Sequence, residues 1–546
     1  MRTFPQGIML LLTALLLLGS CVDRDSADSG AGTAPTTRGG RFAGVSLTII
    51  SGSENEGLEP LIQRFAADNG ASISMQYKGS VDIMLELAQG SGMPYDAVWP
   101  ANSLWISLGD SQRVVKHSES IMRSPVVLGV KRSVAERLGW VGSEVRVQDI
   151  LDAAESGELR FGMTSATQSN SGASAYIGYL YAFAGQPEVL TLEQLDDPQL
   201  QDRIRRILGS VQRSSGSSGW LKDSFLERYD SLDAMVNYEA LVIEANQDLQ
   251  RRNMETLYAV YPVDGLAIAD SPLGFVSRGD SRREELFLAL QEYLLSSEVQ
   301  QEILAAGRRT GLLGLNPESV DRTVFNPDWG IDATRTISPI RFPAEDVLRR
   351  ALDLYQVTFR KPSFTVYALD YSGSMEGEGL AEMKRAMRTL LDSELSKKYL
   401  LQPTERDVSV VIPFDDRLLA EWIVNGNDSQ ELSGLLREIE QFQGGGNTNI
   451  YAPVARGVEL IRELGGSERH FPAVILLTDG QSNEGSFAAL RAELDDNGMH
   501  SVPVFSILFG AASEEQLSEI SDYSGGRVFD GKKDLVKAFR QAKGYN

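Results

Sequence analysis

Cysteine and histidine are scarce in this sequence of 546 residues, which contains one cysteine and three histidines. They are scattered along the chain, so a zinc site built from such ligands is disfavoured. The sequence also lacks the GxSxG elbow of serine hydrolases, the GxxxxGK[ST] phosphate loop and the HExxH metalloprotease pair. These absences argue against the common hydrolase and nucleotide-binding classes, and we expect a protein that is not an enzyme.

Positive charge and long apolar runs are also lacking. The chain carries 52 Lys and Arg against 75 Asp and Glu, a formal net charge of −23. An acidic surface repels phosphate backbones, so nucleic acid is not expected as a partner. The apolar stretch Ile8–Leu18 is too short to span a bilayer well.

The first residues have the pattern of a targeting segment. Arg2 precedes the apolar stretch, and small residues precede Cys21, the single cysteine. Leu18-Gly19-Ser20-Cys21 resembles a bacterial lipobox, which implies a lipoprotein signal peptide over residues 1–21, cleavage before Cys21 and lipidation of that residue. An uncleaved signal anchor is the alternative. Both imply an exported chain held at a membrane, facing the periplasm or the exterior, and residues 22–43 are rich enough in Ser, Gly and Asp to form a flexible tether.

From Val45 onward, strand-like and helix-like segments alternate, which predicts a parallel, doubly wound sheet. Ligands of such sheets lie at the carboxyl ends of the strands. The loops expected there place hydroxyls and free N–H groups at helix starts, which suits an anion or another polar small molecule. Each serine can equally be an ordinary turn or helix cap. The candidates are Ser51, Ser53, Glu54, Ser80, Asn102, Ser103, Ser169, Ser171 and Gly172.

Residues 44–315 resemble an extracellular solute-binding protein of the type 2 periplasmic-binding fold. The resemblance rests on SGSENEG, YDAVWPANSLW, SPVVLGVKR, NYEALVIEANQ and GRRTGLLG, in that order. It implies two α/β lobes that close on a small solute across a hinge, with Ser124–Arg132 and Leu257–Gly265 as the crossing and returning segments. Glu54 and Glu239 suit a cationic solute, whereas the serine loops suit an anion.

A second pattern follows a connector, residues 316–360. The apolar run Phe364–Leu369 is followed by Asp370, Ser372 and Ser374, spaced two apart. In an extended loop alternate side chains fall on one side, so these three oxygen donors can converge on one point. Such a cluster suits Mg²⁺ with open coordination positions.

Asp370-Tyr371-Ser372-Gly373-Ser374 resembles the DxSxS metal-ion-dependent adhesion site (MIDAS) of von Willebrand factor type A domains, here residues 361–546. GGGNTNIY and VILLTDGQSNEG match two further segments of that family pattern, although Asn447 precedes Thr448 where the reverse order is common. The resemblance implies a doubly wound, Rossmann-like α/β domain. It also implies that Thr448 and Asp479 complete a site for Mg²⁺, Mn²⁺ or Ca²⁺, which an acidic residue of a protein partner would ligate. The alternatives are a polar turn without metal and a metal that only holds the loops in place.

The sequence therefore predicts an α/β lipoprotein with a two-lobed solute-binding domain followed by a von Willebrand factor type A domain. One hypothesis is a protein that captures a solute and engages a protein partner through the metal. Another is the binding component of an ABC-type transporter, with the second domain docking on the permease. A third, metal-assisted hydrolysis, lacks a positioned base.

Overall fold

The computed structural model describes residues 40–311, 320–333, 337–496, 502–532 and 534–544. The predicted signal peptide, Cys21 and most of the predicted tether lie outside these residues. Residues 40–43, predicted as tether, belong to the folded part, because Phe42 is fully buried and its N–H donates to the carbonyl oxygen of Asn69. No helix in the described ranges is long and apolar enough to cross a membrane.

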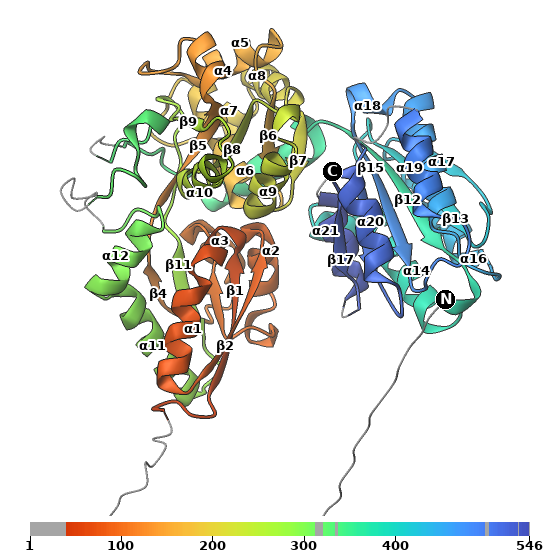
Figure 1. Ribbon diagram of the computed structural model, residues 1–546, viewed down its shortest axis with the longest axis horizontal. Helices are drawn as coiled ribbons and strands as arrows, with labels where there is room; N and C mark the ends of the chain where they lie inside the picture. The colour runs from red at the N-terminus through yellow and green to blue at the C-terminus, as the bar shows by residue number, and fades with distance from the viewer. Residues whose placement is uncertain (1–39, 312–319, 334–336, 497–501, 533, 545–546) are drawn as a thin grey trace, which may run out of the picture.

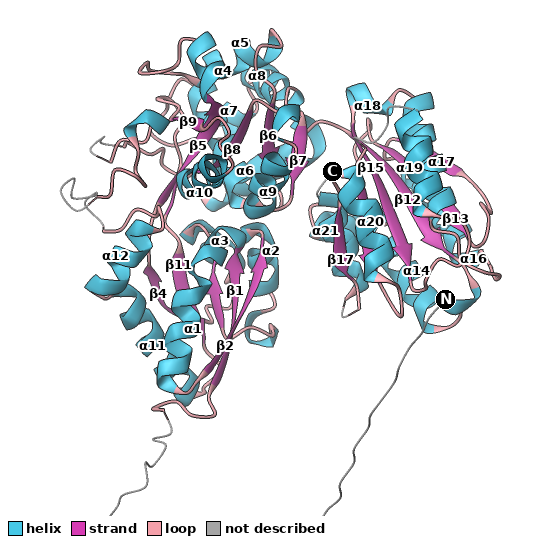
Figure 2. Ribbon diagram, viewed as in Figure 1, coloured by secondary structure: helices cyan, strands magenta, loops and turns pink. Residues whose placement is uncertain are grey.

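The first lobe is a five-stranded sheet covered by helices (Figures 1 and 2). Its strand order is β2-β1-β3-β11-β4, with β11 antiparallel to both of its neighbours. The strands are β1 (Ser46–Gly52), β2 (Ser72–Lys78), β3 (Ala97–Trp99), β4 (Val115–Ser120) and β11 (Pro272–Val276). The helices are η1 (Ser53–Leu58), α1 (Glu59–Asn69), α2 (Ser80–Leu87), η2 (Gly90–Gly92), α3 (Ser103–Gly109), α11 (Ser281–Leu295) and α12 (Ser297–Ala305).

The second lobe is a six-stranded mixed sheet, order β10-β5-β8-β6-β7 with β9 also paired to β5. Its strands are β5 (Ser124–Lys131), β6 (Phe161–Thr164), β7 (Arg213–Ser215), β8 (Ala234–Tyr238), β9 (Leu257–Val260) and β10 (Ile268–Ala269). Its helices are α4 (Arg132–Arg137), α5 (Val147–Glu155), α6 (Asn170–Phe183), α7 (Leu192–Leu195), α8 (Pro198–Gly209), α9 (Ser218–Glu227), η3 (Tyr229–Ser231) and α10 (Glu239–Arg251).

Two sequence predictions about the lobes were wrong in detail. The sheets are mixed rather than purely parallel, because strands that pass between lobes run antiparallel to their neighbours. The segment Leu257–Gly265 does not return to the first lobe: β9 pairs with β5, and the chain crosses back between β10 and β11. An antiparallel backbone bridge pairs Arg123, directly before the crossing strand β5, with Arg309, which follows helix α12.

The connector packs against the second lobe. Val324 and Phe325, and Trp329 at the end of η5 (Pro327–Trp329), join one of its apolar clusters. Helix α13 (Glu345–Leu354) and the π-helix η6 (Tyr355–Phe359) bury apolar side chains in another. The described parts of the predicted connector are therefore extensions of the second lobe.

The C-terminal unit is a six-stranded sheet, order β14-β13-β12-β15-β16-β17, with helices on both faces (Figure 2). Its pairs are parallel except for the edge strand β14, which sequence reasoning did not predict. The strands are β12 (Ser363–Asp370), β13 (Val408–Phe414), β14 (Trp422–Asn425), β15 (Phe471–Thr478), β16 (Val504–Leu508) and β17 (Arg527–Asp530). The helices are η7 (Gly373–Met375), α14 (Glu378–Leu391), α15 (Ser393–Lys398), α16 (Ser429–Gln441), α17 (Tyr451–Glu463), α18 (Gly466–Arg469), α19 (Phe487–Asp496), α20 (Glu514–Ser524) and α21 (Leu535–Gly544).

Strand β12 lies between β13 and β15, and all eight of its residues are buried. Successive side chains of a strand point to opposite faces. Tyr367 and Leu369 accordingly join the cluster under α14 and α21, whereas Val366 and Ala368 join the cluster under α17 and α20. Burial on both faces explains why every residue from Phe364 to Leu369 except Thr365 is apolar. Asp370 is the last residue of the strand and lies at its carboxyl end.

Candidate functional site

Asp370 lies at the end of the central strand β12, and its side chain is fully buried. Its Oδ1 accepts a hydrogen bond from the backbone N–H of Ser372 at 2.8 Å, and its Oδ2 accepts one from the hydroxyl of Thr478 at 2.6 Å. Both carboxylate oxygens are therefore oriented by neighbouring groups. Sequence reasoning missed Thr478; the signal was its place at the end of the adjacent buried strand, directly before Asp479.

The other predicted metal ligands lie beside Asp370. The hydroxyls of Ser372 and Ser374 are 3.1 Å apart, and that of Ser374 donates to Oδ1 of Asp479 at 2.7 Å. A Cβ atom built on Gly480 would lie 3.2 Å from the Ser374 hydroxyl and 3.6 Å from that of Thr448. The structure thus brings all five predicted ligands to one place, and their role as metal ligands stays a prediction.

Glycines allow the loops to approach so closely. A Cβ on Gly444 would lie 2.1 Å from the carbonyl oxygen of Tyr371, and Gly446, with φ +90°, accepts from the N–H of Gly373 through its own carbonyl. Asn483 then holds Thr448, because its Oδ1 accepts from the Thr448 N–H at 3.0 Å. The Gly-rich loop and the loop after β15 together fix the Thr448 hydroxyl.

The chemistry of this donor set fits a hard divalent cation. It combines two carboxylates with three hydroxyls, the oxygen ligands that Mg²⁺ and Ca²⁺ take. Burial raises the pKa of Asp370, as does the nearby Asp479, against the lowering effect of hydrogen bonds from Ser372 and Thr478. A cation would compensate that buried negative charge. In the described ranges no group of three or more His, Cys, Asp or Glu residues is placed to hold a metal, so this site depends on its hydroxyls.

The serine loops of the two lobes meet each other. The Ser53 hydroxyl, from the first lobe, accepts from the Ser217 hydroxyl at 2.9 Å and from the Gly219 N–H at 3.2 Å. Next to this contact, within the second lobe, the Ser218 hydroxyl lies 2.9 Å from the hydroxyl of Ser169 and 2.8 Å from that of Ser171. Sequence reasoning missed the segment Ser217–Gly219; its signal was the repeated SSG of residues 214–219, whose second copy forms the start of helix α9.

Other predicted solute ligands have partners within the fold. Ser51 accepts from Asn55, Ser80 from the Ala101 N–H, and Asn102 caps helix α3. The N–H of Ser103 donates to Asp270. Gly172 allows close packing, since a Cβ there would lie 2.0 Å from the Thr164 carbonyl oxygen. At these positions the contacts favour structural roles: Asn102 caps a helix, whereas Ser51 and Ser80 bond to other parts of the first lobe rather than forming the turns or caps considered for serines from sequence.

Glu239 is fully buried in an ion pair. Its two oxygens accept from Nε and Nη2 of Arg309, each at 2.8 Å, and the Tyr261 hydroxyl donates to Oε2. Arg309 also forms the backbone bridge with Arg123 near the crossing between lobes. These contacts favour a structural role for Glu239 at the hinge over a role in holding a cationic solute.

Glu54 differs from Glu239 because its carboxylate lacks a full set of partners. Its Oε1 is buried without a hydrogen bond, in a small cavity that Arg123, Tyr238 and Arg308 also line. Burial raises the pKa of Glu54 from 4.5 to about 7, against the lowering effect of its own backbone N–H and of Arg308. A Cβ on Gly52 would lie 2.0 Å from this oxygen, so Gly52 makes room for the acid.

The raised pKa predicts a pH-dependent effect of Glu54→Gln. Between pH 4.5 and about 7 the folded chain binds more protons at Glu54 than the unfolded chain, so this group contributes less stability as pH rises. We expect the variant to match wild type near pH 4.5 and to be more stable above pH 7, by at most about 3 kcal/mol. Urea unfolding from pH 4.5 to 8.5 measures the difference. Glu56→Gln, an exposed acid of the same helix η1, should show no such trend, and an equal trend in both variants would refute the assignment.

Two family models match the chain. Residues 47–309 match that of the bacterial extracellular solute-binding protein, and residues 366–538 match that of the von Willebrand factor type A domain. The chain therefore combines an extracellular solute-binding domain with a von Willebrand factor type A domain that follows it. The fold class is mixed α/β, with two mixed sheets in the solute-binding domain and a mostly parallel sheet in the type A domain.

Similar proteins match parts of the chain. The calcium-activated chloride channel regulator 3A-1 from Mus musculus is 25% identical over 173 residues, which are 31% of this chain and only 17% of that protein. The solved sulfate-binding protein SubI from Mycobacterium tuberculosis covers 56% of this chain and 96% of its own, with 16% identity and a TM-score of 0.38. A von Willebrand factor type A structure from Catenulispora acidiphila covers 34% of this chain and 42% of its own, with 16% identity and a TM-score of 0.29.

Proposed function

We propose that this protein is a lipid-anchored binding protein that captures a small solute between its lobes and engages a protein partner through a metal-dependent adhesion site. The chain is a solute-binding protein with a von Willebrand factor type A domain, and solute-binding families are typically non-enzymatic binders. The proposed organisation keeps the boundaries predicted from sequence, with Cys21 as the lipid anchor, except that residues 40–43 join the first lobe.

One observation carries the adhesion part of the proposal: the five predicted ligands converge at the carboxyl edge of the C-terminal sheet. When bound, Mg²⁺ would supply a hard positive centre with a position left open for an outside carboxylate. Asp370, Ser372, Ser374, Thr448 and Asp479 would hold it. Asp370 is oriented by Thr478, and Thr448 by Asn483, so the loops are preorganised by residues that need not touch the partner.

The solute part rests on the hydroxyls that line the meeting of the lobes. The Ser53 and Ser217 hydroxyls bond to each other across the line where the lobes meet, and Ser218, next to Ser217, bonds to the hydroxyls of Ser169 and Ser171 within the second lobe. Hydroxyls and helix N-termini suit an anion or a neutral polar molecule. We therefore propose a polar small molecule as the solute.

Binding to acidic peptides tests the adhesion site. The full chain would be passed over immobilised peptides that each present a single Asp or Glu, in Mg²⁺ and in EDTA. We expect binding that falls at least tenfold, about 1.4 kcal/mol, in EDTA and in Asp370→Ala. Glu376→Ala removes an exposed carboxylate from the same loop and should leave binding unchanged. Binding that persists in EDTA would rule out a metal-bridged contact.

Transport is the second candidate, because the first two sheets belong to an extracellular solute-binding domain. In that case the type A domain would dock on an ABC-type permease. Uptake of labelled solutes by cells that carry the wild-type protein or Asp370→Ala distinguishes transport from adhesion. Uptake that needs the protein favours transport, whereas loss of peptide binding in Asp370→Ala without any change in uptake favours adhesion.

A further inference from the structure

The von Willebrand factor type A domain lies against both lobes of the solute-binding domain, on the side formed by β17 and α21 (Figure 1). Its junction residues are Phe505, Tyr523, Gly525, Lys537 and Arg540. They come from β16, α20, α21 and the turn before β17. The predicted metal ligands lie at the carboxyl edge of the same sheet and make none of these contacts.

Two charged pairs join this face to the first lobe. Lys537 Nζ lies 3.1 Å from Oε1 of Glu86 and 3.5 Å from the hydroxyl of Tyr95, and Arg540 pairs with Asp82. Asp82 and Glu86 both belong to helix α2, and their side chains are only 11% and 15% exposed. Because these charges are largely removed from water, losing one partner costs far more than at an exposed pair.

The same face also binds the second lobe. The Arg540 carbonyl oxygen accepts from Nε2 of Gln168 at 3.2 Å, and the Tyr523 carbonyl oxygen accepts from Arg228 at 3.2 Å. Arg213 donates to the carbonyl oxygen of Gly525. Arg540 therefore contacts one lobe with its guanidinium and the other with its backbone.

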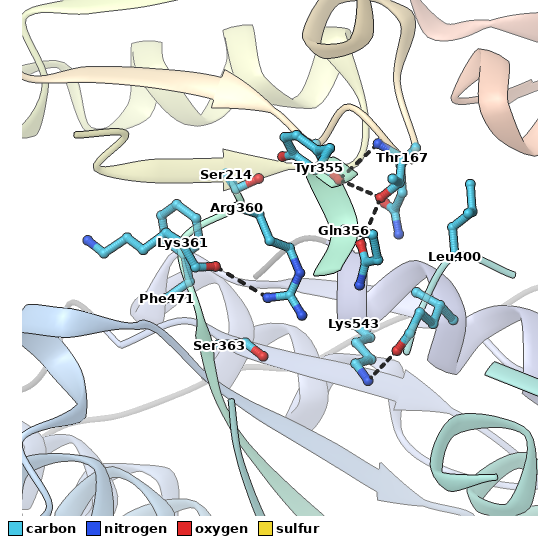
Figure 3. Close-up of a pocket in the computed structure, with 13 residues that line it drawn as sticks. Thr167, Ser214, Tyr355, Gln356, Arg360, Lys361, Ser363, Leu400, Phe471 and Lys543 are labelled. Atoms are coloured by element: carbon cyan, nitrogen blue, oxygen red, sulfur yellow. Dashed lines mark hydrogen bonds between the residues drawn. The ribbon is translucent and has the colours of Figure 1, made fainter. Parts of the chain in front are cut away.

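The connector adds a further contact between the second lobe and the C-terminal unit (Figure 3). The Thr167 hydroxyl donates to Oε1 of Gln356 at 3.3 Å, and Nε2 of Gln356 donates to the carbonyl oxygen of Gln402. Thr167, Gln356 and Lys543 line one small cavity, where Lys543 donates to the Leu401 carbonyl oxygen. These bonds hold the end of α21 close to the connector.

The lobes are closed on each other where the junction covers them. The Val81 N–H, from the first lobe, donates to the Gln168 carbonyl oxygen at 3.2 Å, and a Cβ on Gly79 would lie 2.0 Å from that oxygen. Gln168 thus contacts the first lobe through its backbone and the type A domain through its side chain. Because the type A domain contacts both lobes this closely, it fits only one relative orientation of the lobes.

A cavity of about 420 Å³ lies at this three-way junction. The first lobe contributes Ser53 and Lys78, the second Ser217 and Trp220, and the type A domain Arg527 and Phe529. Because Ser53 and Ser217 bond directly to each other, the cavity leads to the line along which the lobes must part to admit a solute. The type A domain covers that line.

We infer that the type A domain clamps the two lobes in the closed arrangement, so that opening of the solute cleft requires its release from at least one lobe. The open arrangement of the lobes and the binding of the type A domain to both lobes exclude each other. Release of the domain therefore favours open lobes, and opening of the lobes favours release of the domain. The inference concerns the regulation of the proposed solute cleft and rests on that cleft, but it does not depend on the metal site.

Glu86 offers the sharpest variant. Its Oε1 lies between Lys78 Nζ at 2.8 Å and Lys537 Nζ at 3.1 Å, so Glu86→Lys would bring three amines together and repel α21. Adding Lys537→Glu would return a carboxylate between two amines. Lys532→Glu makes the same charge change as Lys537→Glu at an exposed residue just before α21. Lys532 is not one of the junction residues named above, so this variant serves as the matched control.

The test uses the full chain with Cys21→Ser, so that two introduced thiols carry the only spin labels. Asp68→Cys on α1 and Asp202→Cys on α8, both exposed, report the distance between lobes by pulsed electron resonance. Small-angle scattering of each protein reports release of the type A domain. Since no solute is added, failure of this test is distinct from failure to bind a solute.

We expect Glu86→Lys to increase the radius of gyration and to add a longer distance between the lobes. Both changes should disappear in Glu86→Lys with Lys537→Glu and be absent in Lys532→Glu. Release of the domain without any change in the lobe distance would overturn the inference. So would an unchanged radius of gyration in a variant with both Lys537→Glu and Arg540→Glu, because the contacts would then not hold the domain in place.

Discussion

Asp370→Ala is expected to abolish the rise in melting temperature that Mg²⁺ gives to the type A domain. A ligand at a hundred times its Kd stabilises the folded state by about 2.7 kcal/mol, which for a domain of this size is a rise of roughly 5–10 °C. Asp370 is the buried carboxylate at the centre of the donor set, so its removal should eliminate the whole shift. Thermal melts in EDTA, Mg²⁺, Mn²⁺ and Ca²⁺ measure it.

Glu376→Ala is the control for that experiment, since it removes an exposed carboxylate two residues after Ser374. It should keep the full shift. Equal shifts in wild type and in Asp370→Ala would show that the cation binds elsewhere, and no shift in either protein would show that the loops alone do not make a useful site.

Glu239→Ala is expected to destabilise the solute-binding domain by about 3–5 kcal/mol, because it leaves the Arg309 guanidinium buried without its partner. Arg309 is held by both oxygens of Glu239 and also forms the backbone bridge with Arg123. Urea unfolding followed by tryptophan fluorescence measures the loss in the transition of that domain.

The double variant Glu239→Ala with Arg309→Ala provides the control for Glu239. Removing both charges should cost less than the sum of the two single changes, because neither charge is then left unpaired. If Glu239→Ala leaves stability unchanged but weakens binding of a cationic solute, the structural role is wrong and the prediction of a ligand role stands.

Much of the fold could be predicted from sequence because its signals are local. The run from Phe364 to Leu369 is apolar at every position but Thr365 because β12 is buried on both faces, and Asp370 is the last residue of the strand before the polar loop. By contrast β14, whose residues alternate in exposure at the sheet edge, lacks such a run. The path of the chain between lobes was also missed, since β9 and β10 carry similar apolar residues and only tertiary pairing distinguishes them.

The two candidate sites differ in the same way. The predicted metal site draws on three segments that each contain an oxygen donor at the end of a strand or in a Gly-rich loop, so sequence pointed to all five residues. In the cleft, Ser53 is paired with Ser217 from a loop more than a hundred residues away, and no local pattern links them. The contacts of Arg540 with both lobes likewise depend on how whole domains pack, which spacing along the chain does not reveal.

Direct titration with Mn²⁺ is the measurement that tests the central claim most directly. Free Mn²⁺ gives an electron resonance signal that disappears on binding, so the bound fraction can be followed for wild type, Asp370→Ala and Thr448→Ala. The account predicts one saturable site in wild type, competed by Mg²⁺, lost in Asp370→Ala and weakened in Thr448→Ala. Equal binding in all three proteins, or none in wild type, would contradict it.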